Sequence, residues 1–220
     1  MSPIIYALAG YLVQVLASVG VGTNLALYQV FFALLSGRFL ASRGALVPAL
    51  AHCALSEAAI RRSVAAVAYG KWSLADLLTA WQKVVLAEGH FQAHEYEGYR
   101  PVAWDLVGFF RPHLEGQVGK HYTSQASKAL PAMVFAMIAA VGSVGKKRLP
   151  LLRRLIRQKP EESEVQLQKR ALQEAARTLD PKEVLVADAG FSHEDLQETK
   201  KSYVVRLDQN TTARRNVLPM

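Results

Sequence analysis

Two aspartates stand at the ends of short apolar runs. Asp188 follows the run at residues 184–187, and Asp105 follows the run at residues 99–104. Short apolar runs bounded by turn residues are typical of buried strands, so we expect each carboxylate at a strand end. Carboxylate oxygens bind hard divalent cations. The pair therefore predicts a shared Mg²⁺ or Mn²⁺ site.

Two such cations can activate a water or a 3′ hydroxyl on one side of a phosphodiester and stabilise the leaving oxygen on the other. An aspartate after an apolar run is commonly a turn former or helix cap, so neither residue is informative alone. Their shared context favours the catalytic interpretation, because a glycine and a phenylalanine follow both Asp105 and Asp188 within five residues.

The charge balance of the 220 residues favours a polyanionic partner. Lys and Arg number 26 against 18 Asp and Glu, giving a formal net charge of +8 and an isoelectric point near 9.7. Such a balance predicts nucleic acid before an acidic protein surface, and we expect no small-molecule substrate. The single cysteine, Cys53, excludes an internal disulfide and a cysteine-rich zinc site. We therefore expect an intracellular, cytoplasmic protein.

Residues 1–37 contain no charged side chain, which raises the question of a membrane span. Glycines and polar residues such as Gln14, Asn24 and Gln29 interrupt the stretch, and it lacks the basic start and cleavage site of a signal peptide. We expect buried helices here and no membrane partner.

The pattern changes near residue 90, which predicts two domains. Residues 1–90 have helical periodicity at 4–17 and 24–37, with further helices beginning at Ser56 and Ser73. The short helices and the basic pair Arg61 and Arg62 resemble a helix-turn-helix. We interpret residues 1–90 as a helical DNA-binding region.

Residues 91–220 have alternating strand and turn signals. Besides the two aspartate segments, strands are expected at 119–123 and 203–207, and helices at 161–178 and from Ser192 to Lys200. The apolar run 131–141 fits either a strand or a buried helix, because periodicity does not separate them. The expected fold class is α/β (α+β), with a mixed sheet and flanking helices.

Residues 146–159 carry seven positive charges interleaved with leucine and isoleucine, which predicts a basic amphipathic helix. A solvated face and a membrane-surface helix are alternatives to a phosphate-binding face. We take the nucleic-acid interpretation. The expected phosphate contacts, from this segment and the helical region, are Arg61, Arg62, Lys146, Lys147, Arg148, Arg153 and Arg154.

The blocks around the two aspartates resemble those of DDE-type insertion-sequence transposases. Asp105 is followed at the family's spacing by an aromatic residue, a basic residue and Pro112, and Asp188 is followed by Gly190 and Phe191. The strand with Arg206 and the asparagine after it are also similar. The resemblance implies a partial ribonuclease H-like core, in which the strands of the two acids lie side by side.

The same resemblance implies the function. Asp105 and Asp188 would be catalytic metal ligands, and Arg206 would position substrate. The partner would be double-stranded DNA at transposon ends, with a homo-oligomer possible. The family's third carboxylate is a glutamate on a later helix, whereas no glutamate follows Glu198 here. Glu194 and Glu198 come too early for that role. We therefore expect a truncated transposase, inactive alone.

Two alternatives stay open. A non-catalytic DNA-binding regulator derived from a transposase predicts DNA affinity that does not depend on divalent metal. A membrane-associated protein, suggested by residues 1–37, predicts partition into detergent and leaves Asp105 and Asp188 unexplained.

Overall fold

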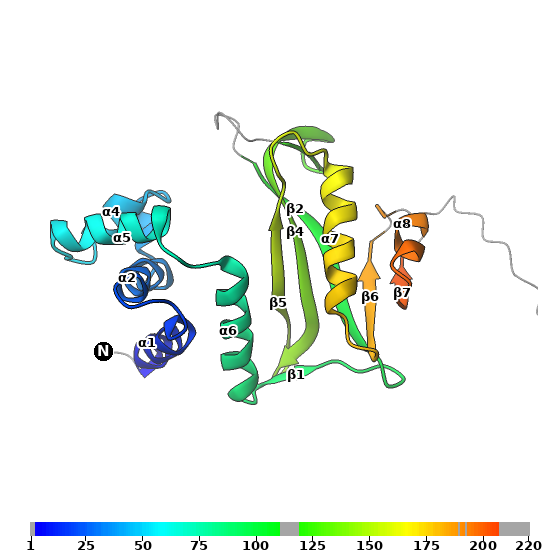
Figure 1. Ribbon diagram of the computed structural model, residues 1–220, viewed down its shortest axis with the longest axis horizontal. Helices are drawn as coiled ribbons and strands as arrows, with labels where there is room; N and C mark the ends of the chain where they lie inside the picture. The colour runs from blue at the N-terminus through cyan, green and yellow to red at the C-terminus, as the bar shows by residue number, and fades with distance from the viewer. Residues whose placement is uncertain (1–2, 111–118, 189, 192, 207–220) are drawn as a thin grey trace, which may run out of the picture. The chain divides into compact units, whose positions relative to one another are not determined.

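The structure is a computed structural model, and it describes residues 3–110, 119–188, 190–191 and 193–206. The chain divides into two compact units, Met1–His90 and Phe91–Met220 (Figure 1). The described part of the first unit is helical, and that of the second is a sheet with two helices, so the fold is α/β. The division falls where the sequence pattern changes.

The described residues of the N-terminal unit form six helices. They are α1 (Pro3–Leu16), α2 (Thr23–Leu35), α3 (Arg38–Ala41), α4 (Leu46–Ala51), α5 (Glu57–Tyr69) and α6 (Leu74–Ala87). The expected serines cap two of them. The Ser56 hydroxyl accepts a hydrogen bond from the Ala59 N–H at 3.3 Å, and the Ser73 hydroxyl accepts one from the Asp76 N–H at 3.1 Å. Each oxygen satisfies a backbone donor that the first helical turn leaves without a partner.

The uncharged N-terminal stretch forms packed helices. Leu16 of α1 and Leu27 of α2 are buried together with Leu77 of α6. Ser63 of α5 is fully buried and donates a hydrogen bond to Gln29 Oε1 of α2 at 2.8 Å. A polar residue of the apolar stretch thus has a partner on another helix. Within the described residues, no helix is both long enough and apolar enough to cross a membrane.

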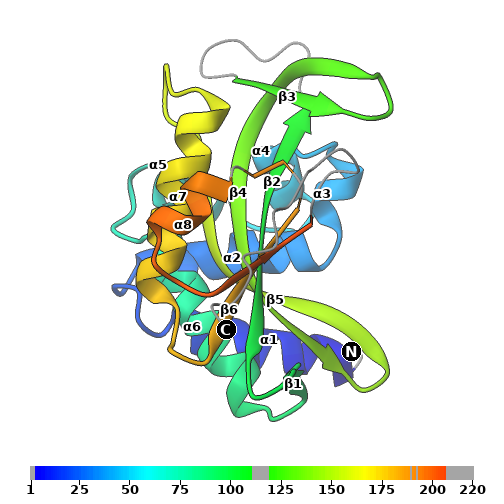
Figure 2. The same ribbon diagram turned by 90° about the vertical axis from the view of Figure 1, so that its right-hand side faces the viewer.

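The second unit contains one seven-stranded sheet. Its strands are β1 (Phe91–Ala93), β2 (Arg100–Phe110), β3 (Gly119–Thr123), β4 (Lys128–Val144), β5 (Lys147–Arg157), β6 (Glu183–Ala187) and β7 (Tyr203–Val205). The strand order is β1-β4-β2-β6-β7, with β3 and β5 also paired to β4. The run 131–141, for which strand and helix were both open, is part of β4. At one end β4 forms a hairpin with β3, and at the other end it forms a hairpin with β5 (Figure 2).

Helix α7 (Glu164–Thr178) covers one face of this sheet (Figures 1 and 2). Its Leu167, Ala171 and Leu172 are buried against Trp104 of β2 and Leu185 of β6. The pattern follows from the helical spacing of these apolar residues, which puts them on one side of α7. The short helix α8 (His193–Glu198) adds Leu196 to the same core.

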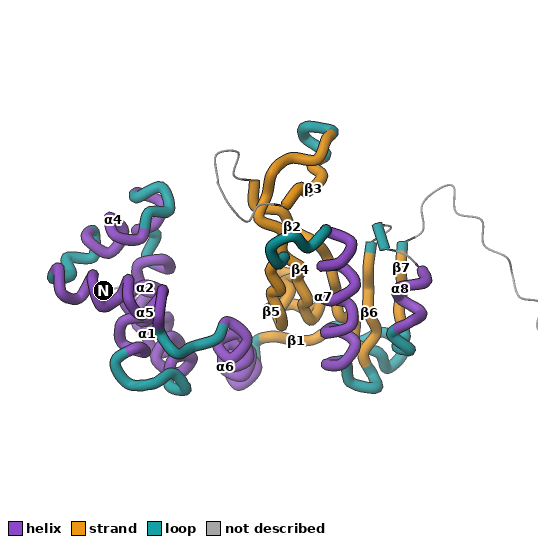
Figure 3. The backbone as a smooth tube through the Cα atoms, turned by 45° about the horizontal axis from the view of Figure 1, so that its top comes forward, coloured by secondary structure: helices purple, strands orange, loops and turns teal. Residues whose placement is uncertain are grey.

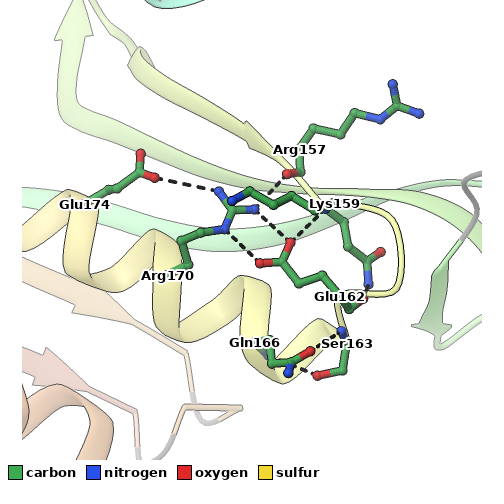
Figure 4. A network of polar contacts seen from close by, with 8 residues as sticks. Arg157, Lys159, Glu162, Ser163, Gln166, Arg170 and Glu174 are labelled. Carbon is green, nitrogen blue, oxygen red and sulfur yellow. Dashed lines mark hydrogen bonds and ion pairs between the residues drawn. The ribbon is translucent and has the colours of Figure 1, made fainter.

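A polar network ties the start of α7 to the end of β5 (Figure 4). Arg170 pairs with both carboxylate oxygens of Glu162, at 2.7 and 2.8 Å, and also donates to the carbonyl of Arg157 at 2.9 Å. The hydrogen bond from Arg170 is the main reason that the pKa of Glu162 is lowered. Ser163 and Gln166 cap α7 reciprocally. The β5–α7 connection is therefore fixed by side chains as well as by backbone.

The positions of Asp105 and Asp188 follow from how β2, β6 and β7 are paired. β2 lies parallel to β6, and β6 lies parallel to β7. Figure 3 shows β6 and β7 side by side. The expectation that the strands of Asp105 and Asp188 lie side by side is confirmed. Parts of the family-like blocks and of the expected caps lie outside the described residues: Arg111, Pro112, Ala189, Ser192 and residues 207–210, which include the end of the strand expected at 203–207.

The prediction of a helix over residues 146–159 is wrong. Residues 147–157 form β5, which pairs antiparallel with β4 after a turn at Gly145, whose φ is +57°. Pro150 was the signal against a helix, because proline inside a helix removes a hydrogen bond and clashes with the preceding turn. This segment pairs with β4 instead. Because strand pairing depends on another part of the chain, the periodicity of the segment does not reveal it.

The prediction that Asp105 ends a strand is also wrong. β2 continues to Phe110, and Asp105 lies opposite Met137 of β4 in the middle of the strand. The reason is that β4 is much longer than β6, so β2 keeps one neighbour after the other has ended. Asp105 is nevertheless level with the end of β6, since Trp104 is opposite Ala187.

Candidate active site

The last pair in the register between β2 and β6 directly precedes the two aspartates. Trp104 lies opposite Ala187, and both are buried on the face that α7 covers. Because side chains alternate along a strand, the next residues, Asp105 and Asp188, belong to the opposite face. Both are exposed. Neighbouring strands lie about 4.8 Å apart, and the last residues of the β2–β6 register, Trp104 and Ala187, directly precede the two acids.

Strand pairing and a local hydrogen bond fix the position of Asp105. Its backbone is part of the β2–β4 pairing, and its Oδ1 accepts a hydrogen bond from the Leu106 N–H at 2.8 Å. A side chain on a paired strand is placed more exactly than one on a loop.

Asp188 is held by Arg206, which directly follows β7. The Arg206 Nε atom lies 2.7 Å from Asp188 Oδ1, and its Nη2 atom donates to Oδ2 at 3.2 Å. The Arg206 N–H donates to the carbonyl of Ala187 at 3.2 Å. Backbone and side chain of Arg206 thus both contact the segment that carries Asp188.

Aromatic packing supports the turn after Asp188. The Phe191 ring contacts Trp104 edge-on, with ring centroids 3.8 Å apart. Gln168 of α7 donates to the carbonyl of Gly190 at 3.1 Å. The phenylalanine that follows the acid therefore anchors the turn on the core. Sequence reasoning noted Phe191 as part of a motif but missed Trp104 and Gln168 as its supports.

Three expected phosphate contacts meet at one hairpin tip. Lys146 lies in the β4–β5 turn, and Lys147 and Arg148 begin β5 opposite Val144 and Ser143. All three basic side chains are exposed. A two-stranded ribbon is narrow enough for the major groove of DNA. The sequence identified these residues, although it assigned them to a helix.

Arg61 and Arg62 are exposed on α5, where Arg61 lies 3.7 Å from Glu57 in a surface ion pair. The helix-turn-helix interpretation joins the helix at Ser56 to the helix at Ser73. In the structure α5 packs on α2 and α4, and α6 packs on α1. The short turn before α5 links it to α4, so these two helices are the adjacent pair.

Arg153 contacts a buried carboxylate. It forms two hydrogen bonds with Glu183, whose side chain is 1% exposed: Nη1 to Oε2 at 2.9 Å and Nη2 to Oε1 at 2.5 Å. Glu183 also accepts from the Asp180 N–H at 3.0 Å, and Arg100 lies 3.9 Å away. Sequence reasoning missed Glu183, because an acid beside turn residues ordinarily indicates solvent exposure.

Charge compensation decides the pKa of Glu183. Burial by itself raises the pKa, but the hydrogen bonds from Arg153 and the Asp180 N–H, with the charges of Arg153 and Arg100, lower it overall. Arg154, the neighbouring candidate, is half-buried opposite Ile138. A β-bulge lies at this point of the β4–β5 pairing, so Arg154 has an opposite residue on β4 and Arg153 has none.

A third carboxylate does not join the pair within the described residues, where no group of three or more His, Cys, Asp or Glu is arranged to hold a metal ion. On α8, Glu194 and Glu198 are exposed, while Asp195 pairs with Lys169 at 3.0 Å. The hydrogen bond that Lys169 donates to Asp195 is the main reason that the pKa of Lys169 is raised. A pocket of about 640 Å³ lies in the N-terminal unit and includes neither Asp105 nor Asp188.

The chain has no match among models of known protein families, and no curated protein matches it. Functional inference therefore depends on the site itself. Asp105 and Asp188 are exposed to solvent, and their carboxylates offer the oxygen ligands that Mg²⁺ and Mn²⁺ prefer. Their chemistry fits a hard divalent cation bound by few protein ligands.

Proposed function

We propose that this protein is a transposase-like DNA-binding protein that holds a divalent cation at Asp105 and Asp188. The observation that supports the proposal is the parallel pairing of β2 with β6, whose last pair, Trp104 and Ala187, directly precedes the two acids. DNA is the substrate class because of the +8 net charge and the exposed basic hairpin tip at Lys146, Lys147 and Arg148.

In this proposal each residue has a defined task. Asp105, fixed in the middle of β2, orients one side of the metal site, and Asp188 supplies the other. The hairpin tip and the exposed arginines of α5 contact phosphates. A bound Mg²⁺ or Mn²⁺ would polarise a phosphodiester and activate a water or 3′ hydroxyl. With two protein carboxylates we expect weak metal affinity and little strand transfer by this chain alone.

Metal titration tests the proposal. Isothermal titration with Mn²⁺ alone should give a binding signal for the full chain that is lost in Asp105→Asn and in Asp188→Asn. Glu57→Gln is the matched control, since it removes one exposed carboxylate charge from α5. Retained Mn²⁺ binding in both aspartate variants would exclude this site.

A non-catalytic DNA-binding regulator is the second candidate. It is favoured by the pairing of Asp188 with Arg206. This candidate predicts duplex DNA binding that is unchanged by chelation of divalent cations. Fluorescence anisotropy with a labelled duplex, in Mn²⁺ and in chelator, distinguishes the two.

The hairpin has its own test. Each phosphate contact that is removed should lower the salt slope of DNA binding by about one unit. Lys146→Gln with Lys147→Gln should therefore flatten the slope by about two units. An unchanged slope would remove the hairpin tip from the DNA interface.

A further inference from the structure

The contact between Arg206 and Asp188 bears on how the proposed metal site is controlled, and the inference drawn from it rests on the proposed function. The guanidinium uses both oxygens of the carboxylate, at 2.7 and 3.2 Å. These are the oxygens that a divalent cation at Asp188 needs. Guanidinium and metal therefore have the same ligand.

The backbone places Arg206 at this position. The hydrogen bond from its N–H to the Ala187 carbonyl extends the β6–β7 ladder by one residue, so Arg206 is fixed directly beside Asp188. The side chain alone is long and exposed: 74% of Arg206 and 56% of Asp188 are accessible to solvent. Exposed ion pairs are weak and easily exchanged. The backbone therefore places the Arg206 side chain beside Asp188, and the ion pair between them exchanges easily.

We propose that Arg206 competes with the divalent cation for Asp188, and that the released guanidinium then contacts a DNA phosphate beside the site. Without metal, Arg206 neutralises Asp188, whose charge would otherwise repel the DNA backbone. With metal bound, the cation takes over this neutralisation. Arg206 stays attached to β6 through its backbone and keeps its charge near the site.

The first experiment measures Mn²⁺ affinity without DNA. Arg206→Gln should bind Mn²⁺ about 1.5- to 5-fold more tightly than the unaltered chain, the factor that corresponds to an exposed pair. Lys169→Gln is the matched control: its side chain is 53% exposed and pairs with the Asp195 carboxylate at 3.0 Å, and the proposal gives it no role in metal or DNA binding. The control should leave Mn²⁺ affinity unchanged.

The outcomes separate this inference from the proposed function. If the unaltered chain binds Mn²⁺ and Arg206→Gln binds it equally or more weakly, competition is wrong and the metal site stands. If Asp188→Asn and Asp105→Asn bind Mn²⁺ as the unaltered chain does, the metal site itself is wrong. Absence of Mn²⁺ binding from both the unaltered chain and Arg206→Gln also overturns the metal site.

A second experiment tests the released guanidinium. In Mn²⁺, the salt slope of duplex DNA binding should be about one unit steeper for the unaltered chain than for Arg206→Gln. In chelator the two slopes should agree, because Arg206 is then engaged with Asp188. Equal slopes in Mn²⁺ would overturn the phosphate contact.

Discussion

Replacing Arg153 should destabilise the sheet unit strongly, although the residue is partly exposed. Arg153→Met removes the two hydrogen bonds to Glu183 and leaves a carboxylate that is 1% exposed. The Asp180 N–H at 3.0 Å and Arg100 at 3.9 Å remain as partial compensation. The variant therefore tests whether a buried charge can stay without its main partner.

The structure sets the magnitude. Breaking a buried ion pair by removing one partner costs about 3–5 kcal/mol. We expect the lower end, about 3 kcal/mol, because Arg153 is 28% exposed and Arg100 stays nearby. Adding Glu183→Gln should restore part of the loss, since the amide is neutral and its oxygen can still accept from the Asp180 N–H.

Urea unfolding followed by tryptophan fluorescence measures these changes in the free energy of unfolding of the sheet unit. The chain has three tryptophans, and a Trp72→Phe, Trp81→Phe background leaves Trp104 in the core of the sheet as the only emitter. A loss below about 1 kcal/mol for Arg153→Met, the size typical of an exposed pair, would refute the buried-pair reasoning. If the loss is that small and the DNA salt slope falls, Arg153 is a phosphate contact, as its sequence context predicts.

Acid should weaken the same interaction. The pKa of Glu183 is lowered in the folded chain, so its stabilising contribution is complete above the ordinary glutamate value of about 4.3. It is lost as the pH falls through the lowered folded value. The stability difference between the unaltered chain and Glu183→Gln should therefore shrink on acidification, and a difference that stays constant would contradict the assigned ionisation.

Three further substitutions test the supports of the two units. Arg170→Met should cost about 1.5–3 kcal/mol in urea unfolding, because charge-assisted hydrogen bonds to Glu162 are lost; an equal loss at a pH where Glu162 is protonated would contradict this. Leu167→Ala, at a fully buried position of α7, should cost about 2–5 kcal/mol and lower the melting temperature, and a change under 1 kcal/mol would mean that α7 does not cover the sheet. Ser63→Ala should cost about 1–3 kcal/mol by leaving Gln29 without its donor, measured as hydrogen exchange in α5, and unchanged exchange would count against that contact.

Several features could be predicted from the sequence because they depend on residues that are close together in the chain. Ser56 and Ser73 cap helices because a hydroxyl at that position satisfies backbone donors within three residues. The turn after Asp188 follows from a short apolar run that meets a glycine. The blocks around Asp105 and Asp188 predicted that their strands lie side by side, and β2 and β6 do pair.

The tertiary structure decided what depends on distant partners. Residues 147–157 became a strand because β4 offers an unpaired edge, a preference absent from the segment's own pattern. Asp105 lies within a strand because β4 outlasts β6 as the neighbour of β2. Arg153 and Glu183 are 30 residues apart and meet only when the sheet forms. Periodicity and capping act over a few residues, whereas strand pairing and buried charge compensation depend on which segments the folded core brings together.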